Sequence, residues 1–261
     1  MNHKLAKLGA LAALTCFCWV AEPVRISTAA SRPVNYATGC PKDRNYSAIF
    51  AILLDTTDSL SPLQQEIVQK KLDELAEKVP RYGKLEIFAV RTSSDRLIEP
   101  LLQVCNPGRA SDTNEWTGNP RLMEKRWHEK FLDPLDKSLK VALSDSISAK
   151  QSPIMEEIQQ VSVQAFFEAP PKTSKRLTIV SDMLQNSAVL NQYRHPESFE
   201  EFEHQPGFLK VRPELNDVDV TILYVRRTSE FNRQGKRHVE FWQSFFAASG
   251  ARIEEVMSIS G

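Results

Sequence analysis

Residues 48–61, AIFAILLDTTDSLS, change abruptly from apolar to polar, and this change decides the fold of the 261-residue chain. An unbroken apolar run, 48–54, is followed at once by the polar residues 55–59. The run is too short to span a membrane as a helix, and its branched side chains indicate a β-strand buried on both faces. Polar residues at the carboxyl end of such a strand lie where ligands bind in open α/β sheets.

Asp55, Thr57 and Ser59 alternate in this polar segment. A tight turn there would direct one carboxylate and two hydroxyl groups at a common point. Hard oxygen ligands with few formal charges suit Mg²⁺ or Mn²⁺, which keep several waters and accept a further carboxylate from a partner. The alternative is a loop in which Ser59 or Ser61 merely caps the following helix. The segment therefore predicts a cation site only if other loops supply further ligands.

Helix and strand signals alternate along the rest of the chain. Ser61 and Gln64 form a capping box around Pro62, and apolar spacing that includes Leu63 continues this helix to Pro80. The later elements expected are strands at 84–91, 97–105 (antiparallel to 84–91), 177–180, 218–225 and 252–259, and helices at 120–139 (kinked or split at Pro134), 152–165, 197–203 and 238–249. This order predicts a three-layer, doubly wound α/β fold with a mostly parallel sheet of about six strands and one antiparallel edge strand.

Charge and the N-terminal residues limit the partners and the compartment. Lys plus Arg equals Asp plus Glu, at 33 each, so the chain has no overall basic field that would indicate nucleic-acid binding. The apolar run 8–21 is shorter than the roughly 20 residues of a spanning helix and is typical of a secretory signal. We expect a signal peptide or an uncleaved membrane anchor at 1–30, a lead-in at 31–45 and one domain at 46–261. A cytosolic protein with an apolar terminus is the alternative.

Export would leave Cys40 and Cys105 in an oxidising compartment, where two thiols could pair once. The strand directions favour this pair. Cys40 precedes the start of strand 48–54, and strand 97–105 runs back to the same edge of the sheet, so the segment 40–46 has only a short distance to cover. Two unrelated buried thiols are the alternative. The sequence thus predicts a Cys40–Cys105 disulfide in an extracytoplasmic protein, whether periplasmic, secreted or membrane-anchored.

The pattern Asp-x-Thr-x-Ser after a buried strand resembles the metal-ion-dependent adhesion site of von Willebrand factor type A domains, usually written Asp-x-Ser-x-Ser. That family takes its metal ligands from three loops at one edge of the sheet. The resemblance implies a first loop with Asp55, Thr57 and Ser59, a second with Ser152 and a third with Asp182. Thr57 stands for the family's Ser and Ser152 for its Thr, so both hydroxyl groups are kept. Taken alone, Ser152 could be a helix cap and Asp182 a turn cap.

In that family an acidic residue of a partner protein completes the coordination of the ion. The resemblance, which covers about residues 46–261, therefore implies a protein-binding module that engages an acidic partner residue through Mg²⁺ or Mn²⁺. The loops around the ion set specificity. Here they include residues 184–212, with Tyr193, His195, Phe199 and Phe202. These side chains suit a partner-contact surface and could equally form the small core of a lid.

Two further function classes are compatible with the sequence. A haloacid-dehalogenase-like, Mg²⁺-dependent phosphohydrolase also places an Asp nucleophile after a buried strand. It needs Asp-x-Asp, whereas the sequence Asp55-Thr56-Thr57 lacks the second carboxylate. A type A-like scaffold that binds partners without metal is the third interpretation. The chain has no phosphate-binding Gly-rich loop, and its histidines, including His238, lack zinc-ligand spacing and are expected at surface or lid positions. We therefore expect a binding protein and not an enzyme.

Overall fold

The structure is a computed structural model that describes residues 32–261 except 91–97, 114–117, 145–148 and 195–197. One compact unit, Pro33–Gly261, contains the whole sheet. The expected signal or anchor at 1–30 and the expected contact residue His195 lie outside the described residues. Within the part of the chain that is described, no helix is long and apolar enough to cross a membrane.

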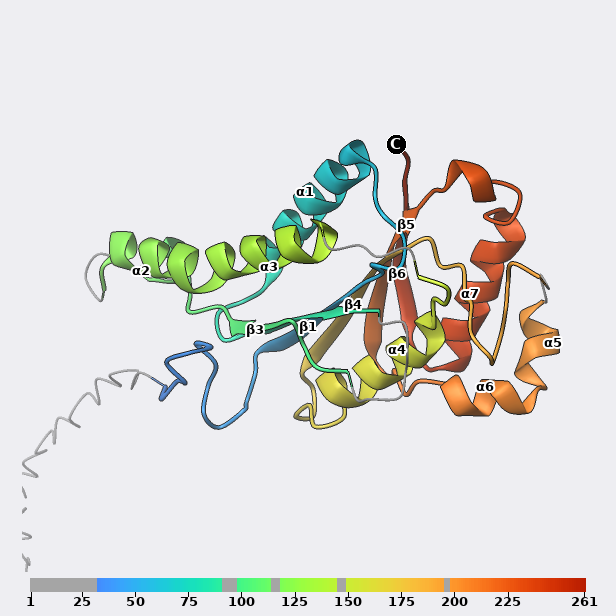
Figure 1. Ribbon diagram of the computed structural model, residues 1–261. Helices are drawn as coiled ribbons and strands as arrows, with labels where there is room; N and C mark the ends of the chain where they lie inside the picture. The colour runs from blue at the N-terminus through green and yellow to red at the C-terminus, as the bar shows by residue number, and fades with distance from the viewer. Residues whose placement is uncertain (1–31, 91–97, 114–117, 145–148, 195–197) are drawn as a thin grey trace, which may run out of the picture. The chain divides into compact units, whose positions relative to one another are not determined.

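Six strands form one sheet in the order β3-β2-β1-β4-β5-β6 (Figure 1). All neighbours are parallel except β2 and β3, which pair antiparallel. The central strand β1 is buried along its whole length, as its apolar sequence requires. The predicted doubly wound α/β class is confirmed. The strands are β1 Ala48–Leu54, β2 Lys84–Ala89, β3 Leu102–Cys105, β4 Ser174–Ser181, β5 Val218–Val225 and β6 Arg252–Ile259.

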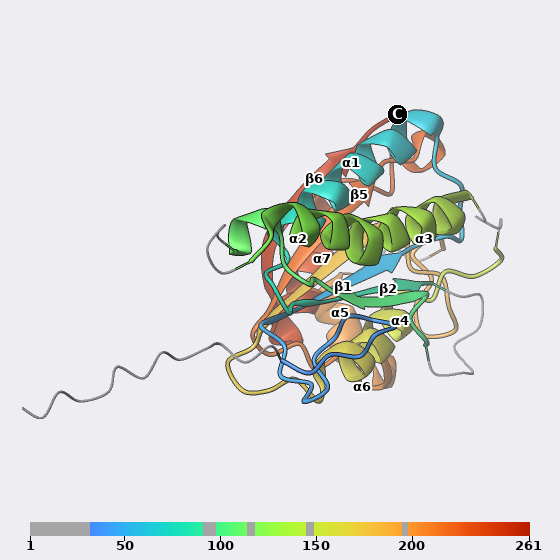
Figure 2. The ribbon, with the colours of Figure 1, turned by 90° about the vertical axis from the view of Figure 1, so that its left-hand side faces the viewer.

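Helices cover both faces of the sheet (Figures 1 and 2). They are α1 Pro62–Lys78, α2 Pro120–Trp127, α3 Asp133–Ser144, α4 Ile154–Val161, α5 Phe199–Glu203, α6 Pro206–Val211 and α7 Lys236–Ala248, with 3₁₀ turns at Ala110–Asp112 and Thr228–Glu230 and π-helical turns at His128–Leu132 and Ser162–Phe166. On one face Ile52 of β1 joins the core formed with α1, α2 and α3. Its neighbour Leu53 joins the core on the other face, with α4, α5, α6 and α7. Alternate residues of β1 therefore fill two cores, which explains why the strand is apolar throughout.

The start of α1 follows the predicted capping box. Ser61 Oγ accepts the N–H of Gln64 at 3.2 Å, and Gln64 Oε1 accepts the N–H of Ser61 at 3.1 Å. The apolar face agrees with the expected spacing at Leu72, which is buried, but not at Leu63, which is 53% exposed; Val68 is buried as well. Gln64 is itself buried, and its Nε2 donates to a backbone carbonyl of the loop after β5. The buried polar contact sets the rotation of the helix, which apolar spacing alone does not reveal.

The helix around Pro134 is continuous, since residues 120–144 are helical throughout. Just before the proline the chain widens into a π-helical turn, in which the N–H of Asp133 donates to the carbonyl of His128. Proline lacks an N–H and its ring collides with the carbonyl four residues earlier in a regular helix. A wider turn removes that collision, so the predicted kink or split takes the form of a π-bulge.

The lead-in belongs to the domain. Cys40 and Cys105 form a disulfide with their Cα atoms 4.8 Å apart, so the predicted pairing is confirmed. The N–H of Cys105 donates to the carbonyl of Thr38 at 2.9 Å, and Val34 forms an antiparallel bridge with Pro41. Because β3 is an edge strand, these contacts cover part of an otherwise unpaired edge. The compact unit accordingly begins at Pro33, ahead of the boundary expected at residue 46.

Replacing both bridge cysteines by Cys40→Ser and Cys105→Ser should lower the free energy of unfolding by about 4 kcal/mol, because the bond closes a loop of 65 residues. Urea unfolding with and without reductant measures this difference. Reductant should shift the midpoint of the wild type and leave the double variant unchanged. Mass spectrometry under non-reducing conditions that finds alkylatable thiols at both positions would contradict the bridge.

Candidate metal and partner-binding site

Neighbouring parallel strands place polar residues side by side at one edge of the sheet. The N–H of Asp55 donates to the carbonyl of Val180 at 2.8 Å, just beyond the register that joins β1 to β4. Asp55 therefore lies beside Ser181, the last residue of β4, and Asp182 follows directly. In the next strand Tyr224 is opposite Ser181, so the loop after β5 reaches the same edge. The topology thus gathers three loops, as expected for parallel strands.

The Asp55 carboxylate is the centre of a cluster of hydroxyl groups. Its Oδ1 accepts the N–H of Thr57 at 3.1 Å and the hydroxyl of Thr57 at 2.6 Å. Its Oδ2 accepts the hydroxyl of Ser181 at 2.7 Å and that of Ser152 at 3.4 Å. Thr57 Oγ1 and Ser152 Oγ are 3.2 Å apart. Side chains from the first and second predicted ligand loops are therefore in direct contact.

Ser152 does not act as a helix cap. The N-cap of α4 is Pro153, and no side chain caps this helix end. The backbone of Ser152 instead pairs with that of Asn186 through two hydrogen bonds of 2.9 Å, which link the loop before α4 to the loop after β4. Only 7% of Ser152 is exposed. The pairing turns its hydroxyl group toward Asp55 and accounts for its presence in the cluster.

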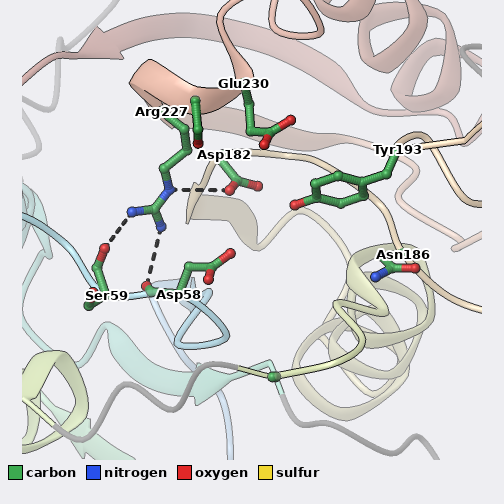
Figure 3. Close-up of a pocket in the computed structure, with 9 residues that line it drawn as sticks. Asp58, Ser59, Asp182, Asn186, Tyr193, Arg227 and Glu230 are labelled. Carbon is green, nitrogen blue, oxygen red and sulfur yellow. Dashed lines mark hydrogen bonds and ion pairs between the residues drawn. The ribbon is translucent and has the colours of Figure 1, made fainter.

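Asp182 is bound by a basic residue from the loop after β5. Arg227 Nε donates to Asp182 Oδ2 at 3.2 Å, and Nη2 donates to the Asp58 carbonyl at 3.2 Å. Arg227 Nη1 donates to the carbonyl of Ser59 (Figure 3). Asp182 Oδ1 accepts the N–H of Leu184 at 2.9 Å. Two of the expected ligand residues, Ser59 and Asp182, are thus joined through a guanidinium group.

Burial and like charge raise carboxyl pKa values at this edge. The pKa of Asp182 is raised to about 7, chiefly by burial and then by the Asp55 carboxylate, while the Leu184 N–H and the Arg227 guanidinium oppose the shift. Burial also raises the pKa of Asp58, again against the effect of Arg227. A positive charge at this edge stabilises the ionised carboxylates, and a cation is the natural ligand for such an environment.

An open pocket of about 450 Å³ lies over the edge (Figure 3). Its lining contains three carboxylates and one guanidinium group, together with the Tyr193 phenol, which points toward Asp182 in Figure 3. Burial raises the pKa of Tyr193, so its hydroxyl stays protonated and can donate. The lining residues are Asp58, Ser59, Ala149, Asp182, Asn186, Tyr193, Arg227, Ser229 and Glu230.

Phe202 and, in part, Phe199 follow the lid-core interpretation. Phe202 has no exposed area and packs against the rings of Phe208 and Phe241. Phe199 is half-buried and meets the same two rings edge-on. These aromatic contacts attach α5 and α6 to α7. The expected partner surface is wrong for the fully buried Phe202 and stays a prediction for the partly exposed Phe199, and Tyr193 is the predicted loop residue that reaches the pocket.

The donor set fits a hard divalent cation. Among the residues that the structure describes, no three His, Cys, Asp or Glu side chains converge as metal ligands. An ion at this edge would therefore depend on two carboxylates and on hydroxyl oxygens. Mg²⁺ and Mn²⁺ accept such ligands and keep several waters. The candidate donors are Asp55, Thr57, Ser59, Ser152 and Asp182.

A buried polar network fixes the turn that follows Asp182. Met183 has a positive φ of 61°, and its carbonyl accepts from Trp242 Nε1 at 2.8 Å and from His238 Nε2 at 3.0 Å. His238 Nδ1 lies 2.6 Å from the hydroxyl of Tyr224. Because a carbonyl only accepts, Nε2 carries the proton and Nδ1 accepts from Tyr224 in the neutral ring. His238 is 8% exposed, so its expected surface or lid position is wrong.

Three residues that contribute to the site are not among those predicted from the sequence. Ser181 had a clear signal, because it directly precedes Asp182 at the end of a predicted strand. Arg227 had a weaker one, since it follows the next predicted strand by two residues and must lie at the same edge. Gln234 had none. It is fully buried, and its Nε2 donates to the carbonyls of Asp182 and Val225, contacts that only the packed loop creates.

No protein-family model and no curated protein match the chain. Among solved structures, the fold is similar to the SpRpn10 VWA domain, with 10% identity and a TM-score of 0.40 over 82% of this chain and 88% of that chain. It is similar to BatB from Bacteroides thetaiotaomicron, with 13% identity and a TM-score of 0.41 over 82% and 91%. It is also similar to the manganese-loaded TRAP protein of Plasmodium vivax, with 13% identity and a TM-score of 0.39 over 83% of this chain and 69% of that chain. Each likeness concerns the fold alone.

Acid should destabilise the domain through His238. Burial lowers the pKa of His238 to about 4, with the Met183 carbonyl opposing and the Arg226 charge reinforcing the shift. The unfolded chain takes up a proton near pH 6.5 while the folded state resists it, so the stability that neutral His238 contributes is complete above that pH and is lost as the pH falls toward 4. The loss is on the order of 3 kcal/mol.

Urea unfolding between pH 7.5 and 4, run on the wild type and on His238→Gln, measures this dependence. The free energy of unfolding of the variant should fall less steeply across the interval, because glutamine takes up no proton. Equal slopes in the two proteins would contradict the assignment.

Proposed function

We propose that this chain is an exported or envelope-anchored protein-binding module of the von Willebrand factor type A kind. It engages an acidic residue of a partner protein through a Mg²⁺ or Mn²⁺ ion at the carboxyl edge of the sheet. The ion would supply a positive charge, and a carboxylate of the partner would complete its coordination. The residues that would hold it are Asp55, Thr57, Ser59, Ser152 and Asp182.

The observation that carries the proposal is the meeting of the Thr57 and Ser152 hydroxyl groups at the Asp55 carboxylate. Thr57 and Ser152 are 95 residues apart in the chain and are only 5% and 7% exposed. Neither serves as a helix cap, so a structural role in helix termination does not account for the arrangement. The raised pKa of the neighbouring Asp182 supports a cation at the same place.

Export is part of the proposal. A disulfide persists in oxidising compartments, so the Cys40–Cys105 bond supports an extracytoplasmic location. Residues 1–30 would direct the chain there, either as a removed signal or as an anchor through residues 8–21.

Mg²⁺ should raise the melting temperature of the purified domain. A ligand that binds only the folded state stabilises it, by about 1.4 kcal/mol for each tenfold rise in concentration above Kd. Asp55→Ala and Thr57→Val should fold and lose this increment, because each removes an oxygen ligand.

Asp219→Ala is the matched control. It removes one carboxylate at the opposite end of β5, where Asp219 pairs with Arg252, and should keep the full Mg²⁺ increment. An unchanged increment in Asp55→Ala, measured by calorimetry over the same Mg²⁺ range, would refute the ligand assignment.

A type A-like scaffold that binds its partner without metal is the second candidate. Arg227 favours it, because the guanidinium already lies against Asp182 and neutralises part of the acidic edge. The two candidates differ in the thermal response to Mg²⁺, which a metal-free scaffold lacks.

A phosphohydrolase is the enzyme alternative. It requires a general acid two residues after the nucleophile. That position is taken here by Thr57, whose hydroxyl group donates a hydrogen bond to Asp55. Hydrolysis of p-nitrophenyl phosphate with Mg²⁺ should therefore stay at background in the wild type and in Asp55→Asn. Turnover that disappears in Asp55→Asn would replace the binding proposal with an enzyme.

A further inference from the structure

Arg227 connects two parts of the proposed ion site. In Figure 3 its guanidinium lies between the Asp182 carboxylate on one side and Asp58 and Ser59 on the other. It makes three hydrogen bonds, one to the carboxylate and one to each backbone carbonyl of the turn. The Arg227 side chain is 18% exposed and that of Asp182 is 4% exposed. The contact is therefore a partly buried, charge-assisted bridge, which is stronger than an exposed ion pair.

The backbone beneath Arg227 is held in place by Gln234. The Oε1 atom of this fully buried residue accepts the N–H of Arg227 at 2.7 Å. Its Nε2 donates to the carbonyl of Asp182 at 3.1 Å and to that of Val225 at 2.7 Å. One amide group thus ties the chain at Arg227 to the chain at Asp182. The base of the arginine is fixed, while its long side chain can change rotamer.

We propose that Arg227 is a built-in competitor of the divalent ion, so that an ion that takes Asp182 as a ligand must displace the guanidinium from Asp182 and from the Asp58–Ser59 turn. This inference rests on the proposed function. Both oxygens of the Asp182 carboxylate are already engaged, Oδ2 by Arg227 and Oδ1 by the Leu184 N–H, and the guanidinium lies between two of the candidate ligand residues, Ser59 and Asp182. A divalent ion bound to Asp182 would be repelled by the guanidinium at short range. Arg227 thereby sets the ion affinity of the site and protects the acidic edge when the ion concentration is low.

Isothermal titration with Mg²⁺ and with Mn²⁺ tests the competition. Arg227→Gln should bind either ion about tenfold more tightly than the wild type, since the ion no longer has to break a charge-assisted bridge. Arg233→Gln is the matched control, because it removes the same charge near the pocket, where Arg233 is 42% exposed and pairs with Glu230. A general field effect would change both variants equally, whereas direct competition changes Arg227→Gln by far the most.

A second measurement uses the wild type and is independent of how well the variant folds. The Nε–H resonance of Arg227, assigned by its loss in Arg227→Lys, should shift and exchange faster with water as Mg²⁺ is added, because its hydrogen bond to Asp182 is broken. An Nε–H signal that stays unchanged while Mg²⁺ binds would overturn the competition.

The outcomes separate the inference from the function on which it rests. Equal ion affinities in the wild type and Arg227→Gln would overturn the competition and leave the metal-dependent module intact. Binding by Arg227→Gln alone would support the competition in its strongest form, with Arg227 excluding the ion from the wild type. Absence of ion binding in the wild type and in a folded Arg227→Gln would overturn both.

Discussion

The hydrogen bond from the Asp55 N–H to the Val180 carbonyl fixes where the first polar residue after β1 meets the end of β4. Because side chains alternate along a strand, a slip of one residue would turn Asp55 away from Ser181 and exchange the two cores that β1 fills. The strand register therefore fixes both the burial of the β1 side chains and the position of the hydroxyl cluster around Asp55. Ser152 joins this cluster only because its backbone pairs with the loop that leaves β4.

Electrostatics at this edge act against folding unless positive charge is supplied. Asp182 is almost fully buried, and its pKa is raised by burial and by Asp55. Hydrogen bonds from Leu184 and Arg227 offset part of the cost. The Asp182 carboxylate is thus desolvated and oriented by the fold itself, an environment in which a nearby positive charge stabilises the ionised form. The contacts that stabilise Asp182 are therefore the same ones that an ion would have to replace under the proposed function.

Features encoded by local chemistry could be predicted from the sequence. The strands at 218–225 and 252–259 have the predicted bounds, and the predicted last helix ends before Gly250, whose positive φ of 79° suits a glycine. Features that depend on long-range packing could not. Leu63 faces solvent because the buried amide of Gln64 sets the rotation of α1, and Gln234 stabilises the site through contacts visible only once two loops have packed. Asp55 and Asp182 could be singled out because each directly follows a predicted strand or its last residue. Placing Arg227 beside Asp182 also requires the order of the strands in the sheet.

The Cys40–Cys105 bond also determines how the domain bears mechanical load. The pairing of Lys84 with Cys105 places the bond at the amino end of β2, whereas the acidic pocket is at the carboxyl ends of β1 and β4. Tension applied upstream of Cys40 would divide between the backbone that leads into β1 and the covalent link to β3. A pull between that end and the pocket runs along the strands, so the hydrogen bonds of the central ladders are loaded together and are not opened one after another. The bridge thus ties the segment that precedes β1 to the edge strand β3, at the end of the sheet away from the pocket, so that a load applied there is shared by two strands.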